Sequence, residues 1–390
     1  MMQRRSPMGA DLIRRAIVAG MPLALLSGHP VFRALAWAQA ANTGRLLVQR
    51  AVPLAAEMPL SGFDTWITPN DLFHILTTMA DPLPTIDPAA WRLSVDGLVE
   101  QPVTLTYDQL KALPGRKVVA VLECAGNSRN SVSPPLERSH LGNGYVGNAE
   151  WLGVPLHRVL ERAGVKSSAR EVVLEGMDRG KPAFAQEEVP FAKSLPIEKA
   201  LHPDTLLVYQ MNGVPLPREH GGPVRAVVPG WYGTYHVKWL GRVGVIDRSF
   251  DGVFMTRAWR MRRRVDGLVR DEAVTQVAVK SLIVRPAADA KLTVGTHTVA
   301  GAAWSGGKDI VSVQVSADGG RTWGFAQLVE SPAMYAWRFW EFPWRVTQPG
   351  SYTLMARATD TSGAVQPFAY DLDSGGFAVN QVQPVKVEVT

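Results

Sequence analysis

The last third of the chain is a succession of short strand patterns separated by turns. Seven segments rich in β-branched and aromatic residues alternate with turns of Gly, Pro and Asp, such as Asp318-Gly319-Gly320. Over roughly 100 residues this spacing is typical of an immunoglobulin-like β-sandwich, although the usual cysteine pair is absent. The seven predicted strands are residues 277–284, 292–300, 310–315, 323–328, 336–342, 351–358 and 385–390.

The region before the sandwich, from about residue 66 to 246, mixes two kinds of pattern. Apolar and polar residues alternate at 91–95, which indicates a strand, and residues 156–163 have helical periodicity that ends at Gly164. The regular strand–helix alternation and the G-x-G-x-x-G run of a dinucleotide fold are both absent. We therefore predict an α+β domain, which the basic stretch 257–264 joins to the sandwich as a linker.

Residues 1–40 have the features of an export signal. Arginine pairs at 4–5 and 14–15 precede an apolar stretch, and Ala38-Gln39-Ala40 fits a cleavage site. The paired arginines favour the twin-arginine route, which exports folded proteins, over an ordinary secretory signal or an uncleaved anchor helix. We expect cleavage near Ala40, a periplasmic location and no later membrane span. The predicted divisions are therefore the signal 1–40, a catalytic domain 41–260 and the sandwich 261–390.

Charge and cysteine content exclude several classes of protein. The chain has a formal charge of +6, but five arginines against one aspartate give residues 1–40 a charge of +4 and leave only +2 for the rest. This small excess argues against nucleic acid as a partner. A single cysteine, Cys124, excludes intramolecular disulfides, cysteine-rich zinc sites and iron–sulfur clusters, and no C-x-x-C-H run is present for covalent haem.

The segment around Cys124 carries the strongest chemical signal. The apolar residues 118–122 predict a buried strand, and the turn that begins at Gly126 allows the backbone to bend towards a ligand. Arg129 places a positive charge nearby, which would lower the pKa of the thiol. From these residues alone, Cys124 is an inert core residue, a nucleophile or one ligand of a cofactor.

This segment closely resembles the molybdenum-ligating motif of the sulfite oxidase family, in which a cysteine is followed by Ala-Gly-Asn and an arginine. Further similarity covers nearly all of the chain after residue 40, in the family's order. The resemblance implies a molybdopterin-binding domain followed by a sandwich dimerisation domain, and hence a homodimer. The other matching segments are residues 148–156, 209–216, 220–225, 229–230, 237–240, 303–307, 316–323 and 336–338.

The resemblance also implies roles for individual residues. Cys124 would be the protein's ligand to a molybdenum bound by one pterin dithiolene, and Arg129 and Trp259 would be catalytic neighbours. The residues implied in cofactor binding are Asn127, His220, Arg225 and Lys238. The last two offer a guanidinium and an ammonium for the terminal phosphate of the pterin, and His220 can donate to the phosphate or the pterin.

The chain departs from the family's pattern where sulfite would bind. The family's Arg-Asn-His segment aligns with Leu76-Thr77-Thr78, its active-site tyrosine with Trp259, and a third arginine, loosely, with Asp373. A pocket with less positive charge predicts a substrate that is neutral, larger or reduced at the metal, such as an S-oxide or N-oxide. Three further residues line the pocket or serve only packing: Tyr232, Tyr235 and His236.

These features predict a periplasmic molybdenum oxidoreductase that transfers an oxygen atom to or from a small molecule. Because no haem motif is present, a separate carrier such as a c-type cytochrome or a quinone-linked protein would exchange the electrons. The basic residues Arg260, Arg262, Arg263 and Arg264 either dock such a carrier or form a solvated linker. One alternative is the molybdenum subunit of a sulfur-oxidising complex like sulfane dehydrogenase, and another is a cofactor-free periplasmic binding or adhesion protein with Cys124 in its core.

Overall fold

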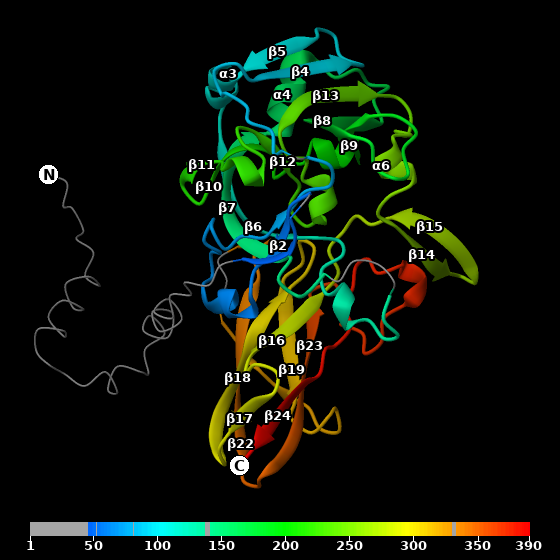
Figure 1. Ribbon diagram of the computed structural model, residues 1–390. Coiled ribbons are helices and arrows are strands. Elements are labelled where there is room, and N and C mark those ends of the chain that lie inside the picture. Colours follow the sequence, from blue (N-terminus) through cyan, green and yellow to red (C-terminus); the bar gives the residue numbers. More distant parts are fainter. Residues whose placement is uncertain (1–45, 52, 81, 137–140, 330–332) are drawn as a thin grey trace, which may run out of the picture. The chain divides into compact units, whose positions relative to one another are not determined.

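The computed structural model describes residues 46–390 except 52, 81, 137–140 and 330–332 (Figure 1). These residues belong to one compact unit that spans residues 44–390. The predicted export signal 1–40 lies outside the described residues. Within the described part of the chain, no helix is long and apolar enough to cross a membrane.

The first part of the chain forms three sheets. A small sheet has the order β1-β2-β3, a second sheet has the order β11-β10-β7-β6 with β12 also paired to β10, and a third has the order β5-β4-β13-β8-β9. All pairs in these sheets are antiparallel except β4 with β13. The strands are β1 (Leu47–Arg50), β2 (Ala55–Glu57), β3 (Ile75–Leu76), β4 (Arg92–Gly97), β5 (Val103–Thr106), β6 (Arg116–Glu123), β7 (Val146–Pro155), β8 (Glu171–Gly180), β9 (Val189–Pro196), β10 (Leu206–Met211), β11 (Val214–Pro215), β12 (Arg225–Val227) and β13 (Leu240–Ile246).

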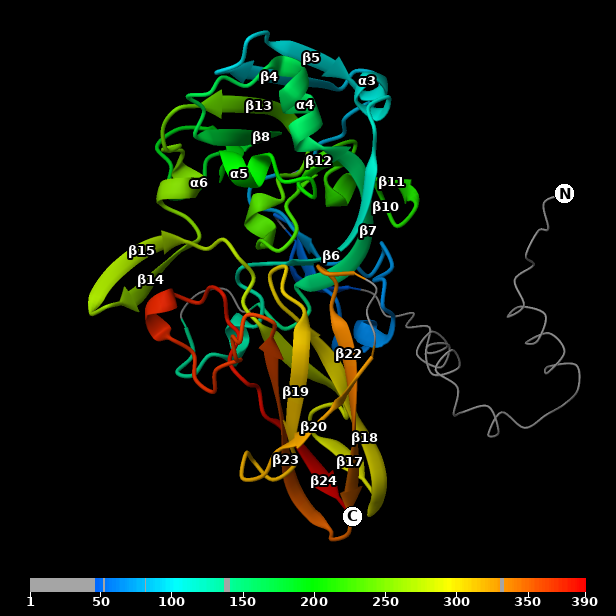
Figure 2. The same cartoon turned by 180° about the vertical axis from the view of Figure 1, so that it is seen from behind.

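Four short α-helices connect these strands, namely α3 (Tyr107–Lys111), α4 (Leu156–Ala163), α5 (Ile197–Ala200) and α6 (Val253–Thr256). Helix α4 has the predicted bounds, because its apolar face repeats every three to four residues and Gly164 ends it with a φ of 70°. That face packs on the third sheet in a core that includes Leu93, Leu174 and Val243 (Figures 1 and 2). The result is the predicted α+β arrangement.

The stretch 257–264, predicted as a linker, contains a strand. Residues Arg260–Val265 form strand β14, which pairs antiparallel with β15 (Leu268–Ala273). Arg262 and Arg263 are exposed, as are Leu268 and Val269 on the partner strand. Met261 is buried, but most residues of the hairpin are exposed, so its sequence lacks the regular apolar–polar alternation that identifies a strand.

The last part of the chain is a sandwich of two sheets, with the strand orders β16-β18-β22-β21 and β17-β24-β23-β19-β20. Every predicted strand corresponds to at least one observed strand, and the short β17 was not predicted. Tryptophans Trp340 and Trp344 fill the space between the sheets together with apolar residues such as Val313 and Leu354. The strands are β16 (Lys280–Arg285), β17 (Ala290–Leu292), β18 (Gly295–Trp304), β19 (Ile310–Ser316), β20 (Gly324–Phe325), β21 (Gln327–Leu328), β22 (Arg338–Val346), β23 (Gly350–Asp360) and β24 (Val385–Val389).

Candidate active site

A cavity opens beside the end of strand β6. It encloses about 740 Å³, including the solvent at its mouth. Five of the seven site residues predicted from the sequence line it, which brings together parts of the chain separated by more than 100 residues. These five are Cys124, His220, Arg225, Lys238 and Trp259.

Cys124 lies directly after β6, at the first residue of the turn. Its backbone N–H donates to Tyr145 O at 2.9 Å, and its Sγ accepts from the N–H of Gly126 at 3.4 Å. A Cβ at Gly126 would lie 2.5 Å from Nη2 of Arg129 and 2.8 Å from Cδ1 of Leu141, so a larger residue there would displace these side chains. Burial raises the pKa of the Cys124 thiol, and the N–H of Gly126 and the charge of Arg129 lower it by less. Arg129 thus acts on the pKa in the predicted direction, but the prediction of a lowered thiol pKa is wrong because burial has the larger effect.

Arg225 and Lys238 also line the cavity and add positive charge to it, and the part of the wall that they form is called the cationic side below. The guanidinium of Arg225, on β12, donates to His220 O at 2.7 Å and to His236 O at 2.8 Å. Lys238 is partly buried, and its Nζ donates to Glu219 O at 3.2 Å. Among the described residues neither cation forms an ion pair with a carboxylate. Burial lowers the pKa of Arg225 to about 9 and, with the charge of Arg225, that of Lys238 to about 7.

His220 lies between the cations and the N-terminal segment. Its Nε2 is 3.0 Å from Asn70 O, so this nitrogen donates its proton to the carbonyl. Burial lowers the pKa of His220 to about 4, so the ring is neutral at pH 7 and Nδ1 is an acceptor. Gly221 has a φ of 103°, and a Cβ there would lie 2.7 Å from Cβ of Lys238. The glycine thus permits the close approach of Lys238 and His220.

Two predicted site residues do not line the cavity. Asn127 donates from Nδ2 to Oε1 of Glu123 at 2.9 Å and accepts at Oδ1 from the N–H of Tyr145 at 3.1 Å. Arg129 donates from Nε to Gly376 O at 2.8 Å, and its guanidinium carbon lies 4.9 Å from the centre of the Phe377 ring. Both side chains bind backbone or side-chain atoms around the turn that contains Cys124 and lie outside the lining of the cavity.

The third region of the cavity wall is mostly apolar. Leu76 packs against Cys124 and Tyr145, and Trp259 stacks on Phe254 with ring centres 5.7 Å apart. Trp259 has a φ of 50°, which is uncommon for a bulky residue. The residues that align with an arginine and a tyrosine of the family therefore face the same cavity as Cys124.

The remaining sequence predictions for the pocket have different outcomes. His236 lines the cavity, whereas Tyr232 and Tyr235 do not. Tyr232 accepts at its hydroxyl from the N–H of Ala278, and Tyr235 packs edge-on against Trp231. Packing is therefore the correct interpretation for both tyrosines. Asp373 is exposed in the 3₁₀ turn Leu372–Ser374 and does not line the cavity.

Sequence reasoning did not single out Asp178 or His74, although both line the cavity. Asp178 is buried in β8 with Oδ1 unpaired, and burial raises its pKa to about 6. His74 is buried with Nδ1 unpaired, and burial lowers its pKa well below the ordinary value. A signal existed for Asp178, because it occupies an inward position in the alternation that includes Leu174 and Gly176.

The donor set fits a large polar ligand that carries an anion. Buried polar atoms without a partner normally pair with a ligand or water, and the cavity is lined by four residues with such atoms: His74, Asp178, Thr234 and His236. Arg225 and Lys238 suit a phosphate, and a thiol suits a soft metal. The residues present therefore fit a pterin monophosphate that holds a metal near Cys124.

Comparison with known proteins defines the class. Residues 80–254 match the oxidoreductase molybdopterin binding domain, and residues 271–388 match the Mo-co oxidoreductase dimerisation domain. The fold and the site are thus those of a molybdopterin-dependent oxidoreductase with a dimerisation domain.

The relatives narrow this class. The chain is 35% identical to sulfite oxidase from Gallus gallus over 83% of this chain and 73% of that protein. It is 31% identical to sulfite oxidase from Arabidopsis thaliana, over 83% and 88% of the two chains. The chain belongs to the sulfite oxidase family. It spans about three fifths of the mitochondrial sulfite oxidases that it matches, such as 57% of the Mus musculus enzyme.

One solved structure matches almost the whole chain. The sulfane dehydrogenase SoxCD from Paracoccus pantotrophus has a TM-score of 0.77 and 26% sequence identity, over 99% of this chain and 93% of that chain. Both domains of the present chain therefore have counterparts in a single known architecture.

Proposed function

We propose that this protein is a periplasmic molybdenum oxidoreductase that transfers an oxygen atom to or from a small, weakly charged sulfur- or nitrogen-oxo compound. This proposal rests on one observation: the same cavity is lined by the single thiol of the chain, Cys124, and by two cations, Arg225 and Lys238. Among the described residues, neither cation forms an ion pair with a carboxylate. A thiolate and a phosphate site in one cavity are what a metal-bearing pterin monophosphate requires. Family membership sets aside a cofactor-free binding or adhesion protein.

The residues of the chain have separate tasks in this proposal. Cys124 binds the metal through its thiolate, and Arg225 and Lys238 bind the phosphate of the pterin. When bound, the molybdenum–pterin group supplies two-electron oxygen-atom transfer. Leu76 and Trp259 shape the space beside Cys124 and exclude water from it. No residue of this wall supplies a fixed positive charge.

The apolar wall determines which substrates suit the site. Each charge-assisted hydrogen bond to a dianion contributes roughly 1.5–3 kcal/mol. Leu76 and Trp259 provide none of the contacts that an arginine and a tyrosine would, so sulfite should bind poorly. A screen of sulfite, S-oxides and N-oxides with an artificial redox dye tests this proposal. Turnover of sulfite that exceeds all neutral substrates would contradict it.

A second candidate is the molybdenum subunit of a sulfur-oxidising complex. The observation that favours it is the match to sulfane dehydrogenase over nearly the full length of both chains. In this case the substrate would be a sulfane sulfur, and a cytochrome would accept the electrons. Co-purification of a stoichiometric cytochrome, together with dye reduction by a sulfane-sulfur compound but not by S-oxides or N-oxides, would select this candidate over the first.

Export and assembly complete the proposal. A cofactor-loaded domain crosses a membrane only in folded form, so changing Arg4, Arg5, Arg14 and Arg15 together to lysine should leave precursor in the cytoplasm. Normal periplasmic accumulation would indicate the ordinary secretory route instead. The match of residues 271–388 to a dimerisation domain supports a homodimer, which sedimentation equilibrium would measure directly.

A further inference from the structure

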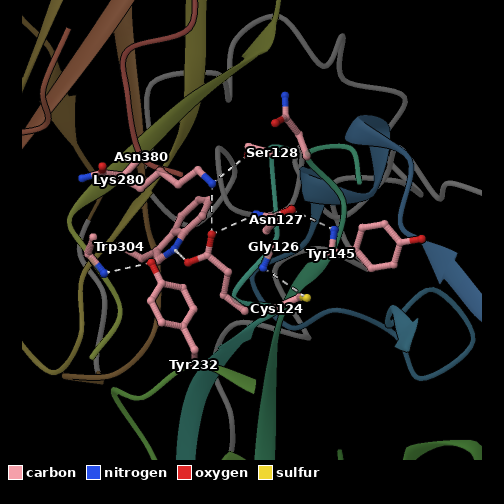
Figure 3. Close-up of polar contacts among 12 residues, drawn as sticks. Cys124, Gly126, Asn127, Ser128, Tyr145, Tyr232, Lys280, Trp304 and Asn380 are labelled. Atoms are coloured by element: carbon pink, nitrogen blue, oxygen red, sulfur yellow. Dashed lines mark hydrogen bonds and ion pairs between the residues drawn. The ribbon is translucent and has the colours of Figure 1, made fainter. Parts of the chain in front are cut away.

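The residue before Cys124 is a buried glutamate whose carboxylate accepts hydrogen bonds from this turn and from the sandwich. Glu123 is 1% exposed. Its Oε1 accepts from Nδ2 of Asn127 at 2.9 Å and from Nζ of Lys280 at 3.0 Å (Figure 3). Its Oε2 accepts from Nε1 of Trp304 at 2.8 Å. Glu123, Asn127, Ser128, Lys280 and Trp304 are referred to below as the Glu123 cluster.

Lys280 contacts both ends of the turn that contains Cys124. Besides the ion pair with Glu123, its Nζ donates to Oγ of Ser128 at 2.7 Å. Lys280 therefore binds the residue one position before Cys124 and the residue four positions after it. Figure 3 shows the ammonium of Lys280 with a dashed line to Ser128.

The two sandwich residues of the cluster form a matched pair. Lys280 begins β16 and Trp304 ends β18, and the two are directly opposite each other in the antiparallel register. Opposed residues in adjacent antiparallel strands project from the same face of a sheet. The pairing of Lys280 with Trp304 therefore places both of their donor groups next to the carboxylate of Glu123. Both side chains are 1% exposed. The geometry of the sandwich ladder thus fixes where the carboxylate of Glu123 can lie.

The loop that precedes β24 makes a second set of contacts with the same turn. The N–H of Ala378 donates to Ala125 O at 2.8 Å, and Nε2 of Gln381 donates to Ser131 O at 3.1 Å. With the bond from Arg129 to Gly376 O, contacts from this loop extend along the residues after Cys124. Residues before, within and after the turn therefore form hydrogen bonds or ion pairs with the C-terminal part of the chain.

A buried ion pair is weak evidence for stability in general, because desolvation offsets much of the attraction. A buried ion pair is better explained as a contact that holds the backbone around it in one of several possible conformations. Here the charged and polar donors of the sandwich converge on the residues that flank the thiol. We propose that Lys280 is a positioning residue: with Glu123 and Trp304 it lets the sandwich domain fix the turn that presents Cys124 to the metal.

This inference rests on the proposed role of Cys124 as the metal ligand, but its first test does not need the metal. Cys124 is the only cysteine, so the rate at which metal-free full-length protein reacts with a thiol reagent reports on this turn alone. Lys280→Met leaves the Glu123 carboxylate without its cation. We expect the thiol to react at least tenfold faster than in the unchanged protein, because the turn opens locally more often.

Two controls separate positioning from general destabilisation. Val313→Ala removes apolar contacts from the sandwich core, and urea unfolding would show how its loss of stability compares with that of Lys280→Met. Lys117→Met removes an exposed lysine on β6 that pairs with Glu150. Neither should change the thiol rate more than about threefold under native conditions. A rate in Lys280→Met no higher than in a Val313→Ala protein of equal stability would overturn the proposal.

The second test uses the metal-loaded protein and does not rely on turnover. The electron paramagnetic resonance spectrum of molybdenum(V) depends on the geometry of its thiolate ligand, so Lys280→Met should shift it while Lys117→Met should not. Lys280→Arg keeps the charge and should give a spectrum closer to that of the unchanged protein. An identical spectrum in Lys280→Met would argue against positioning.

A milder variant covers the case in which Lys280→Met does not fold. Trp304→Phe keeps an aromatic side chain, but it loses the N–H that binds Oε2 of Glu123 and part of the volume of the indole. It should raise the thiol rate severalfold, and an unchanged rate would contradict the inference. The thiol tests also distinguish failure of this inference from failure of the proposed function. If the purified protein holds no molybdenum but the thiol rates change as expected, the proposed function is wrong and the positioning of the turn by Lys280 still holds.

Discussion

The two sides of the cavity differ in charge, although both border the same space. One side presents Arg225 and Lys238, which have no carboxylate partner among the described residues, and the other presents Leu76 and Trp259. The cationic side agrees with the resemblance to the sulfite oxidase family, and the apolar side is where the chain departs from it. On the proposed function, the cationic residues would hold the cofactor and the apolar residues would meet the substrate.

A bound anion would offset the cost of burying the charges of Arg225 and Lys238. A buried guanidinium and a partly buried ammonium are costly unless paired, and the lowered pKa values of Arg225 and Lys238 express this cost. A phosphate dianion would supply the missing partner. The apolar side carries no such cost and therefore needs no charged ligand.

The largest expected effect is on the cationic side. The double change Arg225→Met with Lys238→Met removes two charge-assisted contacts worth roughly 1.5–3 kcal/mol each. Cofactor affinity should fall by about two to four powers of ten, which corresponds to 3–6 kcal/mol. Molybdenum and pterin contents of the purified protein measure the loss. Lys117→Met serves as the control, and normal cofactor content in the double variant would show that the phosphate lies elsewhere.

A smaller effect, of opposite sign, is expected on the apolar side. Leu76→Arg with Trp259→Tyr introduces a cation and a hydroxyl beside Cys124, and together their contacts to sulfite should contribute roughly 1.5–3 kcal/mol. The kcat/KM for sulfite should rise about tenfold to a hundredfold in steady-state assays with a redox dye. The matched control, Leu76→Met, keeps the wall apolar and should leave sulfite turnover low. Efficient sulfite oxidation by the unchanged protein would remove the distinction between the two sides.

The smallest expected effect is a dependence of stability on acid. Burial lowers the pKa of His220 to about 4 and of His236 to about 3, and it lowers that of His74 as well. Between pH 6.5 and 4 the unfolded chain takes up protons at these histidines and the folded chain does not, so stability falls as pH falls. Asp178, with its pKa raised to about 6, acts in the opposite direction and offsets about one histidine.

Urea unfolding at pH 6.5 and 5.5 measures this effect. Each uncompensated histidine should cost up to about 1.4 kcal/mol of unfolding free energy per pH unit. The variant His236→Gln keeps a polar group at this position and removes one titrating ring, so its stability should change less over the same interval. Equal pH dependence in both proteins would show that the histidines on the cationic side are not held neutral by burial.

Local patterns predicted most of the fold but not the contacts between distant segments. Helix α4 ends at Gly164 and the sandwich strands lie where alternation placed them, because periodicity and turn chemistry act over a few residues. The pairing of Glu123 with Lys280 joins residues 157 positions apart, and no local pattern encodes it. The hairpin of β14 and β15 was missed because most of its residues are exposed and its sequence has no regular apolar–polar alternation.

The candidate site was recovered only where a motif carried it. Cys124, His220, Arg225 and Lys238 line one cavity as the resemblance implied, and Trp259 joins them. The side chain of Asn127 points into the turn instead, since Glu123 supplies an acceptor for its amide. Residue type and order predicted which side chains gather here, whereas the direction of each one depends on the tertiary contacts around the turn.

The central claim is that Cys124 binds the metal of a pterin monophosphate held by the cationic side. Elemental analysis of purified protein, with pterin and phosphate assays, tests it most directly. We predict about one molybdenum and one pterin monophosphate per chain. Changing Cys124 to serine should preserve the fold by circular dichroism and lower activity at least about a thousandfold, or ~4 kcal/mol of transition-state stabilisation. Full activity and an unchanged molybdenum(V) spectrum in the serine variant, or no molybdenum in the unchanged protein, would contradict the account.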